Sequence, residues 1–130
     1  MSWQAYVDTS LVGTGHIDKA AIFNSEGTSV WATTPGFTVS PSEISEVVGS
    51  FSDNSDVKKV QSEGFHIGGE KFVALKAEDR SLYGKKGKEG VVIVRTSQTL
   101  IVAHYPETVQ PGNAANTVES LADYLTKAGY

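Results

Sequence analysis

The sequence of 130 residues contains no cysteine, which excludes disulfide bonds and any chemistry that needs a thiolate. Its apolar runs are all shorter than the roughly 18–20 residues that a transmembrane helix requires. The first residues also lack the basic and apolar regions that make up a signal peptide. We therefore expect a cytoplasmic protein with no transmembrane segment.

Histidine is scarce, and the three that are present, His16, His66 and His104, are widely separated. No two of them are four residues apart, and there is no cysteine with which they could share a metal ion. The sequence also lacks a G-x-S-x-G motif and a Walker loop, and its glycine-rich stretches at 13–15 and 84–90 do not join a strand to a helix as phosphate loops do. We expect no enzyme, no bound metal and no cofactor. A small enzyme with an unrecognised pocket is an alternative that mutation of His104 would test.

Charge is sparse and unevenly distributed along the chain. Charged residues make up 20% of the sequence, hydrophobic residues make up 39%, and the net charge is −4. These values are typical of one globular domain, which we place over residues 1–130. Residues 71–95 contain seven basic and three acidic side chains, so this segment is positive and the remainder has a net charge of −8. The basic segment either meets an acidic partner or phosphate groups, or is a set of solvated strand edges. We expect no nucleic-acid partner.

The first segment, residues 2–12, has the pattern of a helix. Trp3, Val7 and Leu11 are four residues apart and form one apolar stripe, with Tyr6 on its flank. The serine that precedes the stripe is suited to cap the first turn by accepting a hydrogen bond from a backbone N–H.

The next part of the chain predicts a hairpin and then two short helices. The hairpin covers residues 16–33 and turns near a glycine. The motif SPSE at 40–43 is a capping box with proline at the first helical position, and it starts a short helix that we expect Gly49 to end. Residues 53–64 predict another short helical turn.

From residue 65 to residue 105 the apolar pattern alternates with period two and is interrupted by short turns, which predicts about five strands. Neighbouring strands must be antiparallel, because a parallel crossover needs about a dozen residues or more. The runs VVIV (91–94) and LIVA (100–103) are apolar on both faces. We therefore expect these two strands to be central and covered on both sides.

The last segment, residues 114–130, predicts a helix with a core-facing stripe formed by Val118, Leu121, Ala122 and Leu125. Together, the elements predict an α+β fold. Its core would be a central antiparallel sheet of about six or seven strands, with the N- and C-terminal helices on one face and two short helices on the other.

Five large aromatic residues deserve to be considered as a group: Trp3, Tyr6, Trp31, Tyr124 and Tyr130. Each of them alone is most simply explained by core packing. However, Tyr6 and Tyr124 lie at the edges of the helical stripes and Tyr130 is terminal, and docking of the two terminal helices would bring the group together. A groove of Trp and Tyr rings suits a proline-rich ligand, because a polyproline II helix is already ordered and its flat rings can stack on aromatic faces.

Several stretches of the sequence resemble the profilin family in the form found in fungi and plants. They are MSWQAYVD at the start, SVWA at 29–32, RSLYGKKGKEGVVIV at 80–94 and the closing HYPETVQPGNAANTVESLADYLTKAGY. The resemblance covers essentially the whole chain. It implies a small cytoplasmic, cytoskeletal protein that binds monomeric actin and promotes exchange of its nucleotide. It also implies binding of proline-rich regulators such as formins and of phosphoinositide head groups.

Residue by residue, the resemblance implies that the five aromatic residues form a polyproline-binding groove. It implies actin binding by Lys71, Arg80, Lys85, Lys86, Val109, Gly112, Asn116 and Glu119. The lysines that we expect to meet phosphoinositide are Lys85, Lys86 and Lys88. The alternative is a membrane-surface regulator in which phosphoinositide binding dominates and the aromatic groove is retained.

Overall fold

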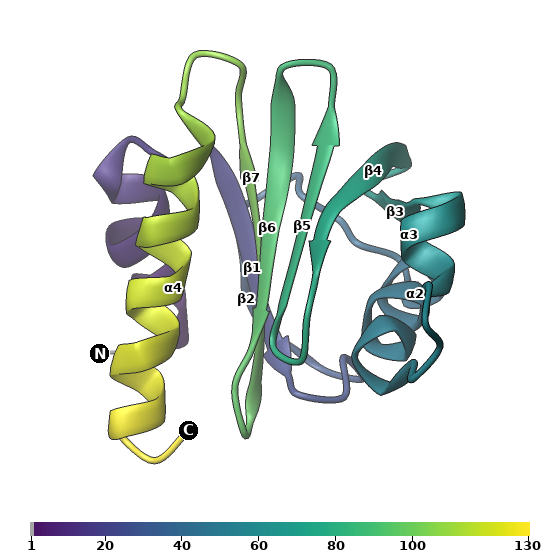
Figure 1. Ribbon diagram of the computed structural model, residues 1–130. Coiled ribbons are helices and arrows are strands. Elements are labelled where there is room, and N and C mark those ends of the chain that lie inside the picture. The colour runs from purple at the N-terminus through teal and green to yellow at the C-terminus, as the bar shows by residue number, and fades with distance from the viewer. Residues whose placement is uncertain (1) are drawn as a thin grey trace.

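The computed structural model describes residues 2–130, which form one antiparallel sheet with helices on both faces (Figure 1). The seven strands lie in the order β2-β1-β7-β6-β5-β4-β3. Their bounds are β1 Lys19–Asn24, β2 Val30–Thr33, β3 Phe65–Ile67, β4 Glu70–Ala77, β5 Ser81–Lys86, β6 Glu89–Arg95 and β7 Thr99–Tyr105. The helical elements are α1 Trp3–Ala5, the π-helix η1 Tyr6–Leu11, the 3₁₀ helix η2 Val12–Thr14, α2 Pro41–Ser52, α3 Lys59–Glu63 and α4 Pro111–Lys127.

The two faces of the sheet have separate hydrophobic cores. On one face, α4 and the N-terminal helical segment pack over side chains that include Val92 and Ile101. On the other face, α2 and α3 cover a cluster that includes Phe72, Ile93 and Val102. The predicted α+β fold, with the terminal helices together on one face, is therefore confirmed (Figure 1). Within residues 2–130, no helix is both long and apolar enough to cross a membrane.

The N-terminal segment is helical as predicted, but it is not one regular helix. Ser2 caps the short α1 by accepting a hydrogen bond from the backbone N–H of Ala5 at 3.1 Å. The chain then widens into the π-helix η1, in which the Val12 N–H bonds to the carbonyl of Val7, and it ends as a 3₁₀ turn. Val7 and Leu11 are fully buried, so the predicted apolar stripe anchors this segment.

Helix α2 starts with the predicted capping box, in which Ser40 and Glu43 exchange side-chain to backbone hydrogen bonds. The prediction that Gly49 ends this helix is wrong, because the helix continues to Ser52. A glycine inside a helix costs only about 1 kcal/mol, and Gly49 does not have the positive φ of a helix-ending glycine.

Strands β6 and β7 are central, as predicted, and β7 is buried along its whole length. All neighbouring strands are antiparallel. Helix α4 begins at Pro111, three residues before the predicted start at 114. Proline at the first helical position explains this, since its fixed φ suits a helix and its missing N–H would have had no helical partner.

Candidate binding surfaces

The structure brings the five aromatic residues into one group on the outside of the terminal helices, which we call the aromatic cluster: Trp3, Tyr6, Trp31, Tyr124 and Tyr130. The ring of Trp3 lies at its centre, with ring centroids 4.8 Å from Trp31, 5.6 Å from Tyr6 and 5.0 Å from Tyr130. The Tyr6 ring also lies 6.1 Å from that of Tyr124. These distances are typical of interacting aromatic pairs, so the cluster is one continuous surface.

A glutamine side chain fixes the N-terminal segment to the edge of the sheet. Gln4 Nε2 donates to the carbonyl of Thr33 at 3.0 Å, and the Thr33 N–H donates to Gln4 Oε1 at 3.4 Å. This pair of bonds connects α1 to strand β2. It therefore holds Trp3 on α1 beside Trp31 on β2.

The outward position of Trp31 results from a β-bulge. Ile22 pairs with Ala32 and Phe23 pairs with Val30, so Trp31 is the extra residue in the β1–β2 ladder. A bulge redirects a side chain and interrupts the strict alternation of a strand. As a result, both Val30 and Trp31 are exposed and only the next residue, Ala32, is buried.

The last residues are attached to the β6–β7 turn. The main-chain oxygen of Tyr130 accepts hydrogen bonds from the Gln98 N–H at 2.6 Å and from Thr96 Oγ1 at 2.9 Å. Gly129 has a φ of 97°, which reverses the chain after α4. These contacts position the ring of Tyr130 against Trp3.

The aromatic cluster is accessible and offers hydrogen-bond donors. Trp31, Tyr124 and Tyr130 are 36%, 53% and 40% exposed. Partial burial, together with the neighbouring phenols, raises the pKa of Tyr6, so its hydroxyl stays protonated. A cavity of about 580 Å³ continues from Tyr6 and Tyr124 between η1 and α4. Flat rings next to such donors can stack on pyrrolidine rings and bind the carbonyls of an extended peptide.

A second exposed surface lies on β4 and β5, on the side of the sheet that carries α4. Lys71 and Val73 alternate with the buried Phe72 along β4, and Val73 is paired with Lys85 of β5. These three side chains therefore share a face. Val73 is 61% exposed, and Leu75, the extra residue of a bulge, is 62% exposed. We call Lys71, Val73, Leu75 and Lys85 the β4–β5 surface.

Sequence reasoning missed Val73 and Leu75 as candidate binding residues. The alternation of β4 signals that one of its faces is apolar. It does not reveal that α4 leaves the second face uncovered, since that depends on where the last helix crosses the sheet.

Two of the residues predicted to bind actin, Arg80 and Glu119, contact one another. Arg80 Nη2 donates to Glu119 Oε1 at 2.7 Å and to Asp123 at 3.0 Å. Ser81 donates to Glu119 Oε2 at 2.7 Å, and the hydroxyl of Tyr83 donates to the same oxygen. Burial of the Glu119 carboxyl favours its neutral form, but the hydrogen bonds outweigh this effect and lower its pKa. The structure thus places Glu119 in a network between α4 and β5.

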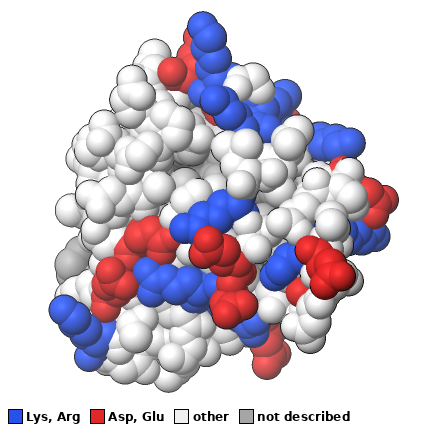
Figure 2. Space-filling view, in the orientation of Figure 1, with Lys and Arg blue, Asp and Glu red and all other residues white. Residues whose placement is uncertain are grey.

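The three lysines predicted to meet phosphoinositide lie on different sides of β5 and its turn. Lys86 lies next to Lys85 but on the opposite face of the sheet, where it donates to Glu70 at 2.7 Å. Lys88 is exposed in the β5–β6 turn. Figure 2 shows basic side chains gathered over this turn, while acidic and basic side chains are mixed across the lower half of the same view.

The remaining residues predicted to bind actin lie around the start of α4. Val109 packs partly against the core, and Gly112 is exposed in the first turn of the helix. Asn116 lines the cavity beside Tyr6 and Tyr124. The structure therefore does not gather all the predicted actin residues on one surface. The assignment of these residues to actin binding remains a prediction.

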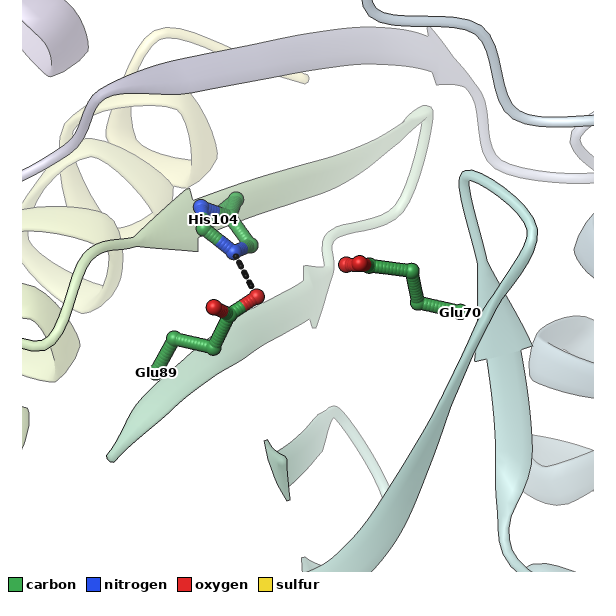
Figure 3. A group of neighbouring side chains, drawn as sticks. All are labelled: Glu70, Glu89 and His104. Carbon is green, nitrogen blue, oxygen red and sulfur yellow. Dashed lines mark hydrogen bonds and ion pairs between the residues drawn. The ribbon is translucent and has the colours of Figure 1, made fainter. Parts of the chain in front are cut away.

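Carboxylates surround His104 in the structure, and the sequence contains no indication of these neighbours. His104 on β7 is 5% exposed. Its Nδ1 lies 2.6 Å from Asp18. Its Nε2 lies 3.1 Å from Glu89, and Figure 3 shows this contact. Glu70 is the third residue whose ligand atom lies within 4.8 Å of the other two, and this group could hold a metal ion. Because the histidine is 86 residues from Asp18 and 15 from Glu89, sequence spacing could not show it.

Comparison with known proteins gives a consistent result. A family model described as Profilin matches residues 1–130. A protein of Saccharomyces cerevisiae named profilin is 53% identical over the whole length of both chains. A solved structure of Schizosaccharomyces pombe profilin is 50% identical, covers 99% of this chain and 100% of its own, and has a TM-score of 0.92. The structure of mouse profilin IIa, solved in complex with a double repeat from the FH1 domain of mDia1, matches over 100% of this chain and 100% of its own. At 23% identity and a TM-score of 0.80, it shares the fold.

Proposed function

The chain belongs to the profilin family, and on this premise we propose that it is a cytoplasmic, non-enzymatic adaptor that binds monomeric actin on one surface and proline-rich segments, such as those of formins, on another. The single observation that carries this proposal is the aromatic cluster. Five exposed or half-exposed rings from α1, η1, β2 and the segment from α4 to residue 130 form one surface. Core packing alone would not leave three of these rings more than a third exposed.

The proline-rich segment binds to the aromatic cluster in this proposal. A polyproline II helix loses little conformational entropy on binding, and its rings can stack on Trp3, Trp31 and Tyr6. Its carbonyls are exposed and can accept hydrogen bonds from the Trp N–H and Tyr O–H groups. The bulge at Trp31 and the Gln4 bonds hold the rings in position before the ligand arrives, which reduces the entropy cost of association.

Actin binds to the β4–β5 surface and the adjoining start of α4. This surface combines exposed apolar side chains, Val73 and Leu75, with the cations Lys71 and Lys85. Such a combination suits an acidic protein partner with an apolar centre to its interface. Binding promotes nucleotide exchange if the adaptor prefers an opened form of actin that releases nucleotide, because a ligand shifts an equilibrium only by its unequal affinity for the two states. No chemistry by the adaptor is needed.

A reciprocal pair of variants tests the two surfaces. Trp3 and Trp31 are the only tryptophans, so their fluorescence should change when a proline-rich peptide is titrated into the protein. Tyr6→Asp places a charge in the aromatic cluster and should weaken peptide binding more than about tenfold, with actin binding retained. Lys85→Glu should weaken actin binding about tenfold and leave the peptide affinity unchanged.

Each variant is the folding control for the other, because each must keep one of the two activities. An unchanged tryptophan signal in the wild type would count against the aromatic cluster as the peptide site. Loss of both activities in either variant, with the circular dichroism spectrum preserved, would contradict the assignment to two surfaces.

We also infer a phosphoinositide-binding activity at the β5–β6 turn. The supporting observation is the exposed Lys88 in the turn that directly follows Lys85 and Lys86, in a segment that is positive although the whole chain has a net charge of −4. Clustered lysines are attracted to anionic head groups, and the attraction falls as salt screens it. Lys86 contributes less than its neighbours because it is already paired with Glu70.

Sedimentation with vesicles that contain phosphoinositide tests this activity. The wild type should co-sediment at low salt and be released as salt is raised, and Lys88→Glu should co-sediment several-fold less. Lys127→Glu is the matched control, because it makes the same change in net charge at the far end of α4. Equal loss in both variants would indicate a response to total charge and would contradict a site at this turn.

A further inference from the structure

The face of the sheet that carries α2 and α3 also holds a group of polar side chains that the proposed function does not use. Glu70 at the start of β4, Glu89 at the start of β6 and His104 near the end of β7 converge there from three strands (Figure 3). We propose that these residues bind a divalent transition-metal cation such as Zn²⁺, with Asp18 orienting the imidazole.

The imidazole of His104 is held in the orientation that a metal ligand needs. Its side chain is only 7% exposed, and its Nδ1 lies 2.6 Å from the Asp18 carboxylate. When Nδ1 carries the proton and donates a hydrogen bond to Asp18, the lone pair of Nε2 points into the group. A carboxylate behind a ligating histidine is the common arrangement in metal sites, where it fixes the tautomer and increases the basicity of the ring.

Glu89 is already close to the geometry of a metal ligand. Its Oε1 lies 3.1 Å from His104 Nε2. In a tetrahedral zinc site with bonds of roughly 2.0–2.2 Å, neighbouring ligand atoms are separated by about 3.3–3.6 Å. A cation can therefore be placed between these two atoms with very little movement.

Glu70 completes the site by turning toward the other two ligands. The three ligand atoms lie within 4.8 Å of one another, which is wider than a closed site, so this side chain must move inward. It has room to do so because it is only half-buried. On moving, it exchanges its ion pair with Lys86, at 2.7 Å, for the cation.

Space and charge are both suitable for a bound ion. A cavity of about 300 Å³ adjoins the group and is lined by Lys19, Gly68, Glu70 and His104 among others, which leaves room for a water molecule as fourth ligand. The carboxylate of Glu70 lies near Lys86 and Lys19, and that of Glu89 lies near Lys86. A divalent cation would be attracted by the carboxylates that converge on the group.

The ligand set favours a transition metal over calcium or magnesium. Imidazole nitrogen is a preferred ligand of zinc, copper, iron and nickel. Calcium takes about six to eight oxygen ligands, and magnesium usually keeps several of its waters. Without a metal, the same geometry suits an imidazolium that donates to Asp18 and Glu89 from both nitrogens, and this is the outcome against which the proposal is tested.

Isothermal titration calorimetry of the full chain with zinc chloride is the direct experiment. We expect saturable binding of one ion per chain, weakened about 10–100-fold or more in Glu70→Gln and in Glu89→Gln, since a lost ligand should matter at least as much as a lost outer-shell partner. Lys86→Gln should bind zinc more tightly, because the lysine no longer competes for Glu70. His66→Gln is the matched control, since His66 also faces a glutamate, Glu46 at 3.2 Å, but lies outside the group.

A spectroscopic readout separates this site from weak surface binding. In nitrogen NMR of the imidazoles, zinc should shift Nε2 of His104 and leave the His66 ring unchanged. The glutamine variants keep His104 in place, so they avoid the folding risk of replacing a buried residue. Absence of saturable binding, equal weakening in His66→Gln, or equal affinity for magnesium and zinc would each overturn the proposal.

Discussion

At the level of single residues, the carboxylate of Glu119 joins helix α4 to strand β5. It accepts hydrogen bonds from Arg80, Ser81 and Tyr83, and these lower its pKa below the ordinary value of 4.5. Ionised Glu119 therefore stabilises the folded state above about pH 4.5, and this contribution is lost as the pH falls through the lowered folded-state pKa.

Replacing this carboxylate by an amide should destabilise the protein in a pH-dependent way. We expect Glu119→Gln to lower the free energy of unfolding at pH 7 by about 1–3 kcal/mol, because charge-assisted hydrogen bonds are lost and buried donors are less well satisfied. The difference in free energy of unfolding between Glu119→Gln and the wild type should shrink as the pH is lowered below 4.5. Urea unfolding at a series of pH values, followed by tryptophan fluorescence, measures both effects.

Asp123→Asn is the control for this experiment. Asp123 contacts the same arginine, but its side chain is 64% exposed, so its loss should cost less than about 1 kcal/mol. An equal cost for the two variants, or a Glu119→Gln effect that is the same at pH 3 and pH 7, would show that the network is not the cause.

The role of Glu119 also shows where sequence reasoning ends at this scale. The sequence resemblance implied that Glu119 and Arg80 bind actin, but they are 39 residues apart, and nothing in their spacing shows that they contact each other. The aromatic residues were easier to predict as a group. The positions of Tyr6 and Tyr124 at helical stripe edges indicated exposure, and docking of the terminal helices was enough to bring the group together.

At the level of elements, the aromatic cluster depends on a connection between α1 and β2. The exposed Gln4 makes two hydrogen bonds to the main chain of Thr33. This connection holds Trp3 and Trp31 with their ring centroids 4.8 Å apart. Without it, the short α1 would be free to move relative to the strand, and the ligand would have to order the rings on binding.

We therefore predict that Gln4→Ala weakens peptide binding although Gln4 is not an aromatic residue. The expected loss of affinity is about 2–10-fold, equivalent to the roughly 0.5–1.5 kcal/mol of one hydrogen bond. Fluorescence titration with the proline-rich peptide measures it. Gln61→Ala in α3, on the opposite face of the sheet, should leave the affinity unchanged, and an unchanged affinity in Gln4→Ala would refute the role of this connection.

Regular elements could be predicted from the sequence and their irregularities could not. The capping box at Ser40, the alternating strands and the stripe of α4 follow from local patterns. The bulge at Trp31 and the π-helix η1 arise from pairing and packing with distant segments, so no local pattern indicates them. The end of α2 was predicted three residues early for a similar reason. A glycine signals a helix end only where the chain then turns into a left-handed conformation.

At the level of the whole molecule, the aromatic cluster and the β4–β5 surface belong to separate parts of the structure. The first is built on α1, η1, β2 and the segment from α4 to residue 130, and the second lies on strands next to the other edge of the sheet. They have no residue in common, and the strands β7 and β6 lie between their supporting strands (Figure 1). The two partners should therefore bind together without competing.

The most direct test of this account is the fluorescence anisotropy of a labelled proline-rich peptide in a single titration. Adding the protein should raise the anisotropy once, and adding monomeric actin to the saturated complex should raise it again, because the peptide stays bound while the complex grows. With Lys85→Glu the first rise should remain and the second should need about tenfold more actin. A fall in anisotropy on adding actin to the wild-type complex would mean that actin displaces the peptide, and this would contradict binding on two separate surfaces.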